Sequence, residues 1–195
     1  MKLLQHVTTK GFPINNIVFF IPSVTLWSDA SEYVIGGYIR NVLAWGWRIT
    51  SEWHGKLTFN LLELLESVVT VYMTILQMGQ GSHILAFAAS SSALRWLHKE
   101  SCDPVNAESH DAVAIWLGWT LVINEKSLYS QKTKGRENIT TDSFSRYFHR
   151  SDRTLTKKFN LILPPQKAAS FHIKQPLRKV ISWISMLWSA LTLLT

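Results

Sequence analysis

Short β-prone segments, mostly apolar and ended by small polar or glycine residues, predict three strands near the start of the chain. Residues 24–31 are rich in β-prone side chains and end in small polar ones, as a strand that runs into a turn does. A second strand is expected at residues 38–41, opened by Gly36 and Gly37, and a third at residues 43–50. Because little chain separates these segments, we expect an antiparallel meander.

The hydrophobic period then changes to that of a helix. Between Thr58 and Gln77, apolar residues recur three or four positions apart, which predicts an amphipathic helix. The later elements are expected as a buried strand at 84–87, a serine-capped helix at 90–99, a helix at 108–123, a strand at 128–133, and a short helix from about 140. This order predicts an α/β fold in which helices flank one five-stranded mixed sheet.

The predicted elements occupy the middle of the chain. Gly11, Pro13 and Pro22 interrupt the first segment, so we expect residues 1–22 to be an N-terminal extension and residues 23–149 to be the folded domain. Residues 150–195 are expected to form a basic C-terminal tail with an apolar helix. The apolar run at 180–195 is shorter than the ~20 residues that span a bilayer. It therefore favours an amphipathic or core-covering helix over a stable membrane span, with association at a membrane surface as a weaker alternative.

Charge and cysteine content add expectations about partners. The formal charge is +7, and residues 150–195 carry eight basic groups against one acid. Such a tail can bind phosphate backbones without sequence specificity, can serve as a solvated extension, or can meet a protein partner. Cys102 is the sole cysteine, so the chain forms no internal disulfide. This agrees with an intracellular location.

Three acidic residues stand on separate predicted elements. Asp29 lies near the end of the first strand, Glu63 in the first turns of the long helix, and Asp142 near the start of the last helix. Each alone has an ordinary explanation: a turn cap, a solvated helix face shared with Glu66, or a helix cap. If the fold brings them together, their charges require a cation, and Mg²⁺ or Mn²⁺ held there can hydrolyse a phosphodiester by two-metal catalysis.

Three segments resemble the ribonuclease H domains that accompany reverse transcriptases in retrotransposons. Residues 27–31 with 35–38 resemble the first two strands of this family, and residues 60–65 its first helix. Residues 135–146 are similar to its closing signature, G-x-x-N-x-x-A-D-x-L-S-R. The likeness covers about residues 12–190. It implies a ribonuclease H-like fold with Asp29, Glu63 and Asp142 as catalytic metal ligands.

The chain departs from this family at its third catalytic acid. Ala89 occupies the position where relatives carry a metal-binding aspartate, and Ser90 beside it is a neutral substitute. Natural decay and deliberate replacement would both give this pattern. Since metal positioning underlies water activation and leaving-group stabilisation, the loss predicts impaired catalysis.

Basic residues surround the expected site. A basic run stands beside the site, formed by Lys126, Lys132, Lys134 and Arg136, and Arg146 follows Asp142. The resemblance implies that an RNA–DNA hybrid contacts these residues, with Lys132, Lys134, Arg136 and Arg146 as the predicted nucleic-acid-binding residues. The ordinary alternative is a solvated turn.

Two functional hypotheses follow. The first is a ribonuclease H-type domain of a retrotransposon polyprotein, which cuts RNA in RNA–DNA hybrids with activity impaired at Ala89. No reverse transcriptase block precedes it, so we expect a fragment or a separately retained domain. The second is a catalytically inactive nucleic-acid-binding or scaffold subunit derived from such a domain.

Overall fold

The computed structural model describes residues 21–40, 42–51, 54–55, 58–79, 81–91, 93–94, 107–134, 138, 141–142, 146–147, 149–151, 153–157, 173–174 and 178–192. Its main elements in chain order are β1 (Val24–Ala30), β2 (Val34–Ile39), β3 (Leu43–Arg48), α2 (Phe59–Ile75), β4 (His83–Ala88), α4 (Ala107–Ile123), β5 (Ser127–Lys132), β6 (Ile173–Lys174) and α7 (Arg178–Thr192). The expected strands and the two long central helices are therefore present. Of the expected helices at 90–99 and from about 140, residues 91, 93–94, 141–142 and 146 are helical, while residues 92, 95–99, 139–140 and 143–145 lie outside the described part.

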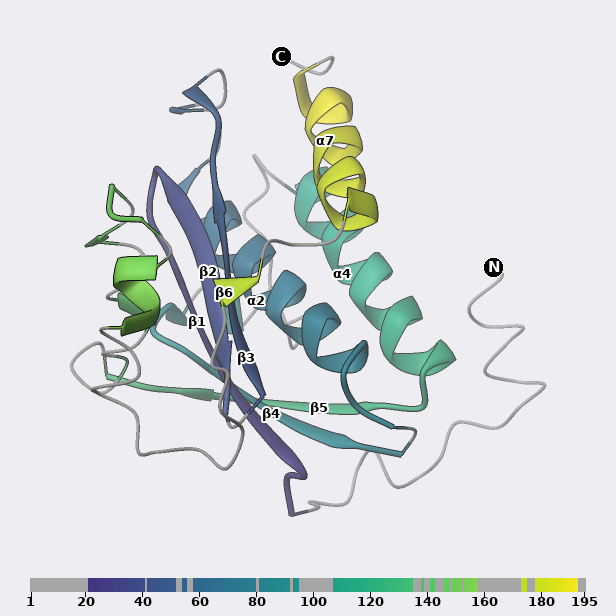
Figure 1. Cartoon of the computed structure of the whole chain (residues 1–195). Coiled ribbons are helices and arrows are strands. Elements are labelled where there is room, and N and C mark those ends of the chain that lie inside the picture. The colour runs from purple at the N-terminus through teal and green to yellow at the C-terminus, as the bar shows by residue number, and fades with distance from the viewer. Residues whose placement is uncertain are drawn as a thin grey trace.

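The strands form one mixed sheet in the order β5-β4-β1-β2-β3-β6 (Figure 1). The pairs β1–β2 and β2–β3 are antiparallel, whereas β1–β4 and β4–β5 are parallel. This arrangement of the first five strands, with helices packed on the sheet, is the ribonuclease H-like topology that the sequence predicts. A sixth strand, β6, joins β3 in parallel and was not expected.

Glycine in β2 sets how closely α2 approaches the sheet. Gly36 and Gly37 lie inside β2, which begins at Val34, and do not precede it as the sequence pattern suggested. A Cβ atom at Gly37 would overlap the Thr70 hydroxyl of α2 and lie 2.5 Å from Nε1 of Trp45. Trp45 is paired with Gly37 across β2 and β3, and its indole N–H donates to Thr70 Oγ1 at 3.1 Å. Because Gly37 has no side chain, the Trp45 indole and the Thr70 side chain of α2 can both lie against β2 at this position.

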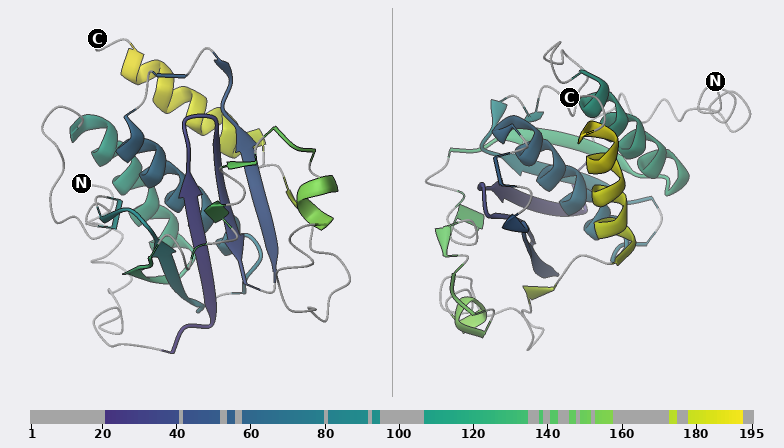
Figure 2. Two further views of the ribbon diagram at one scale, coloured as in Figure 1. Left: turned by 90° about the vertical axis from the view of Figure 1, so that its left-hand side faces the viewer. Right: turned by 90° about the horizontal axis from the view of Figure 1, so that it is seen from above.

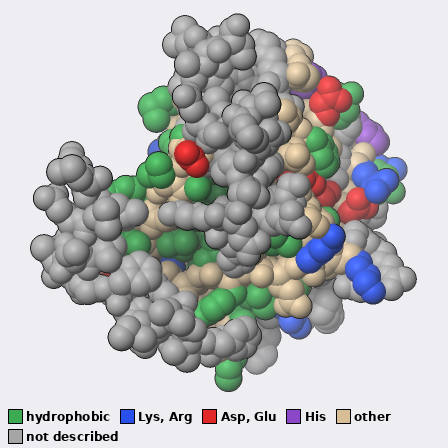
Figure 3. Space-filling model, turned by 180° about the vertical axis from the view of Figure 1, so that it is seen from behind, with side chains coloured by type: hydrophobic (Ala, Val, Ile, Leu, Met, Phe, Trp, Pro, Cys, Tyr) green, Lys and Arg blue, Asp and Glu red, His purple; other side chains and the backbone are tan. Residues whose placement is uncertain are grey.

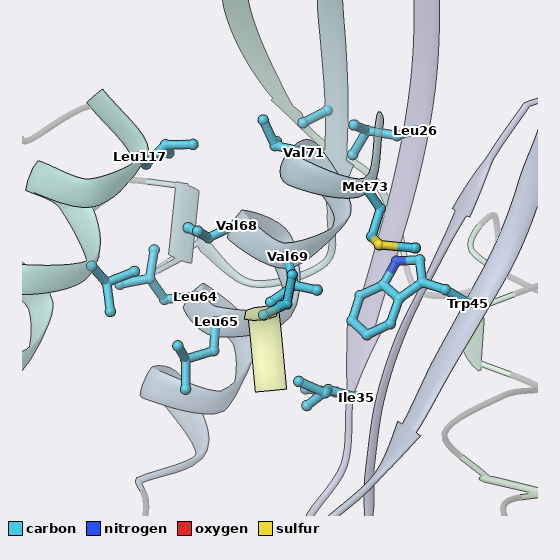
Figure 4. Packing of buried hydrophobic residues seen from close by; sticks show 14 of the residues in the cluster. Leu26, Ile35, Trp45, Leu64, Leu65, Val68, Val69, Val71, Met73 and Leu117 are labelled. Carbon is cyan, nitrogen blue, oxygen red and sulfur yellow. The ribbon is translucent and has the colours of Figure 1, made fainter. Parts of the chain in front are cut away.

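The polar stripe of α2 faces the sheet. The helix begins after Thr58, whose side chain accepts a hydrogen bond from the Leu61 amide. Glu66, Ser67 and Thr70 are buried, so the alternative of a solvated face is wrong for them. Apolar residues complete this contact: Val68 and Val69 lie between Leu117 of α4 and the sheet residues Ile35 and Trp45 (Figure 4).

Helices α4 and α7 cover α2 on the side away from the sheet. The buried residues of α4 include Val113 and Leu117, and those of α7 are Val180 and Ile184. Trp116 of α4 and Trp183 of α7 stack with ring centroids 4.1 Å apart. Residues of the predicted C-terminal tail therefore belong to the main core, as a core-covering helix. Within the described residues, no helix is long and apolar enough to cross a membrane.

The opposite face of the sheet carries a second, smaller apolar cluster. Side chains alternate along a strand, so Tyr38 points away from α2 because Gly37 faces it. Tyr38 packs with Ala44 and with Leu155 from a short helix at 153–157, and Tyr147 lies against the same cluster. Figure 2 shows α2, α4 and α7 on one side of the sheet and this short helix on the other.

Candidate functional site

Asp29 and Ala89 lie at the same edge of the sheet. Asp29 is the penultimate residue of β1, and the parallel register pairs Ser28 with Ala88, the last residue of β4. One residue further along both strands, Asp29 and Ala89 are therefore neighbours. The resemblance places two metal-binding aspartates at these positions, but here one side chain is a methyl group without a ligand oxygen.

Glu63 of α2 reaches the same edge. Its pKa is raised mainly by burial, and further by the charge of Asp29, while a hydrogen bond from the Ser90 side chain opposes the shift. Ser90 follows Ala89 and also caps the next helix by accepting a hydrogen bond from the Ala93 amide. The contacts of Glu63 thus join α2, the end of β1 and the loop after β4.

Asp142 is brought toward this group by a buried polar anchor. The Asn138 side-chain amide donates to the Ser28 carbonyl at 3.0 Å, and the Asp142 amide donates to the Asn138 carbonyl at 3.0 Å. The buried Thr141 hydroxyl bonds to Asn138 as well. Because Ser28 precedes Asp29, this anchor fixes the segment of Asp142 against the site end of β1.

Arg146 neutralises Asp142. Its Nε donates to both carboxylate oxygens, at 2.7 and 2.8 Å. The pKa of Arg146 is raised, first by this hydrogen bond and the charge of Asp142 and, more weakly, by Asp29. The positively charged guanidinium of Arg146 therefore lies close to Asp142 and within electrostatic reach of Asp29.

The described residues do not assemble a complete metal-binding set. In that part of the chain, no three His, Cys, Asp or Glu side chains are grouped so that they could hold a metal ion. In addition, Ala89 offers no oxygen, and the oxygens of Asp142 accept hydrogen bonds from Arg146. The residues present thus do not fit a two-metal centre, and the expected Mg²⁺ or Mn²⁺ stays a prediction.

Glu66 is a further carboxyl group beside the site. It is 2% exposed, and its Oε1 has no hydrogen-bond partner among the described residues. Burial raises its pKa well above the usual value, and Asp29 and Glu63 add to the shift, whereas hydrogen bonds from Ser28 and Ser67 oppose it. The two serine hydroxyls also bond to each other at 3.1 Å. The position of Glu66 on the stripe with Ser67 and Thr70 was the only sequence signal for it.

Replacing Glu66 with glutamine is expected to flatten the pH dependence of stability. Because the folded state raises the pKa of Glu66, it retains the proton at pH values where the unfolded chain releases it. The free energy of unfolding therefore falls as pH rises above 4.5, the ordinary pKa. Glutamine stays neutral. The free energy of unfolding of Glu66→Gln, measured with urea at pH 5 and pH 8, should therefore fall by less than that of the wild type. Equal falls in both proteins would contradict this.

The predicted basic residues occupy different places. Lys132 ends β5 opposite Ala88, and its ammonium donates to Ser91 Oγ at 2.6 Å, beside the site. Lys134 follows on the exposed surface, and the side chain of Arg146 is 72% exposed. Arg136 lies outside the described residues.

The expectation that Lys126 belongs to this basic run is wrong. Lys126 precedes β5 at its other end, where its ammonium donates to the Gly79 carbonyl and to Ser82 Oγ. Lys132 is the sixth residue after it, at the end of extended strand β5, and six steps of about 3.3 Å span about 20 Å. Lys126 therefore stabilises the turn after α2.

No protein-family model matches the chain, and no curated protein matches it in sequence. The likeness to ribonuclease H domains therefore rests on the short segments quoted above and on the topology of the sheet.

Proposed function

We propose that this chain is a ribonuclease H-like domain of retrotransposon origin that binds RNA–DNA hybrids and has little or no cleavage activity. The observation that carries the proposal is the register of β1 and β4, which sets Ala89 beside Asp29, with Glu63 near enough for the charge of Asp29 to raise its pKa. The resemblance implies that Asp29 and Glu63 stand at positions that the family uses for catalysis, whereas Ala89 stands where the family has a further acid.

Basic side chains around these acids support retained binding. Lys132 ends β5 and Lys134 follows it, while Arg146 pairs with Asp142 and lies near enough to Asp29 for the charge of Asp29 to raise its pKa. In space-filling view, Lys and Arg side chains lie close to Asp and Glu side chains along one side of the molecule (Figure 3). Cations arranged in this way can contact phosphates on both sides of a scissile bond without cutting it.

The ion pair between Arg146 and Asp142 favours the inactive form of this proposal. The Arg146 Nε–H is shared between both oxygens of Asp142, so the guanidinium competes with a metal ion for this carboxylate. A scaffold subunit that kept the fold and lost the chemistry would tolerate such a pair.

Binding of a labelled RNA–DNA hybrid at 0.15 M salt tests the proposal. Lys132→Gln combined with Lys134→Gln is expected to weaken binding about tenfold, because each change removes about one phosphate contact. The control is Arg40→Gln with Arg178→Gln, which removes equal charge at exposed positions; Arg40 lies at the end of β2 away from Asp29.

Cleavage is measured in the same samples with Mn²⁺, beside Asp29→Asn. Efficient cutting of the RNA strand that Asp29→Asn abolishes would overturn the inactive assignment. Binding that neither lysine change affects would remove the proposed contact surface.

A further inference from the structure

A basic segment is fixed to the face of the sheet opposite α2. Leu155 is 4% exposed and packs with Tyr38 and Ala44, and Tyr147 lies against the same cluster. Ser151 begins the short helix at 153–157: its side chain accepts a hydrogen bond from the Thr154 amide at 3.3 Å. The backbone of this segment is thus positioned by packing and capping.

Four basic side chains project from this surface, and all four residues are exposed: Arg48, Arg150, Arg153 and Lys157. Arg153 and Lys157 are four residues apart on one helix, so they lie on one side of it. Leu155 lies on the opposite side of this helix and packs against the sheet. Arg48 of β3 donates to the Arg150 carbonyl at 2.9 Å, and the Arg150 guanidinium lies over the Tyr147 ring.

The charges of Arg153 and Lys157 have no acidic partner in the part of the chain that the structure describes. Among the described residues, no carboxylate forms an ion pair with Arg153 or Lys157. Residues 146–158 hold five basic residues against one acid, Asp152, whose placement is outside the described part. Cations held on a fixed backbone without compensating acids favour a polyanion as partner, since little conformational entropy is lost when it binds.

We propose that Arg48, Arg150, Arg153 and Lys157, here called the basic strip, bind the phosphate backbone of a nucleic acid outside the carboxylate site. The inference rests on the proposed function for its class of partner. The strip continues from Arg146, which lies beside Asp142 and Asp29. A nucleic acid that leaves the carboxylate site on this side meets the strip next.

The surroundings of the strip favour phosphodiesters over a membrane. Peripheral membrane-binding segments combine basic residues with exposed large apolar ones. Among the described residues, no exposed large apolar residue is in 146–157, and most of them lie in other loops and on the helices α2, α4 and α7. Tyr33 is the exception near the strip, because its carbonyl accepts a hydrogen bond from the amide of Ile49, the neighbour of Arg48. The apolar residues of the segment instead face the sheet.

The test compares Arg153→Gln combined with Lys157→Gln, in the full chain, with the exposed control pair Arg40→Gln and Arg178→Gln. Binding of a labelled hybrid longer than the carboxylate site is measured between 0.05 and 0.3 M salt. We expect about 10- to 30-fold weaker binding at 0.15 M salt. The dependence of log K on log salt should become shallower by about two, one for each phosphate that the variant no longer neutralises. The control pair should keep the wild-type affinity and slope.

The remaining outcomes separate the two proposals. If the strip variant binds like the control while the Lys132 and Lys134 variant binds weakly, the basic strip is wrong and the proposed function stands. If both variants bind like wild type, both proposals fail. If the wild type ignores nucleic acid but binds vesicles that contain phosphatidylserine, and the strip variant does not, the surface is a membrane contact and the inference is overturned.

Discussion

Replacing Ala89 with aspartate is expected to tighten Mn²⁺ binding at least about tenfold and to raise hybrid cleavage by about a hundredfold. Position 89 lies beside Asp29, and the neighbouring Ser90 already contacts Glu63. The new carboxylate would thus join two acids and supply the ligand that the site lacks. Titration calorimetry with Mn²⁺ and gel analysis of a labelled hybrid measure the two effects.

The matched control is Ala89→Asn, which has nearly the same size as aspartate but no charge. It should leave Mn²⁺ binding near the wild-type level. Asp29→Asn in the Ala89→Asp background should remove the gain if the two carboxylates act together. A variant that gains neither metal affinity nor cleavage would mean that Arg146 keeps Asp142 from the site, or that the acids do not converge on a cation.

Gly37→Ala is expected to lower the free energy of unfolding by about 2–3 kcal/mol. The added methyl group would overlap the Thr70 hydroxyl and approach the Trp45 indole. Relief of this overlap requires α2 to move away from β2 or the Trp45–Thr70 hydrogen bond to break. Either response loosens a contact in the centre of the core. Urea unfolding followed by tryptophan fluorescence measures the change.

Gly118→Ala is the control for this substitution. Gly118 lies within α4, and a Cβ atom there meets nothing within 4 Å. Alanine favours a helix over glycine by up to about 1 kcal/mol. This variant should therefore be as stable as the wild type or more so. Similar destabilisation by both substitutions would show that close packing at Gly37 is not the cause.

The order of strands and helices along the chain could be predicted because each short segment has a local pattern of its own. Residues 24–31 and 43–50 carry β-prone side chains, and the long helix shows its apolar period directly. The actual pairing follows from this order, since three adjacent strands form a meander and a helix must return the chain to a parallel neighbour.

The buried polar stripe of α2 could not be predicted from helical periodicity. Ser67, Thr70 and Glu66 have the composition of a solvated face. They are buried because Ser28 and Gly37 of the sheet leave room for them, and this match joins positions about 40 residues apart. A helical pattern contains no information about the side chains that it will meet.

Distance along the sequence did not predict distance in the fold at two places. Lys126 and Lys132 stand in one basic run, but a strand runs between them and carries them to opposite ends of the sheet. The pairing of β6 with β3 was missed for the converse reason. Within the described residues, Ile173 and Lys174 make this pairing, and they lie far from β3 along the chain.

This distance affects how the protein folds as it is made. Ile173 of β6 pairs with Ala44 of β3, which the ribosome adds 129 residues earlier. At roughly 5–20 residues per second, the edge of β3 waits on the order of ten seconds for its partner. An unpaired edge is a template for pairing with other chains. Slow synthesis or crowded polysomes should therefore favour intermolecular pairing at β3, and a chaperone that shields this edge should raise the yield of native protein.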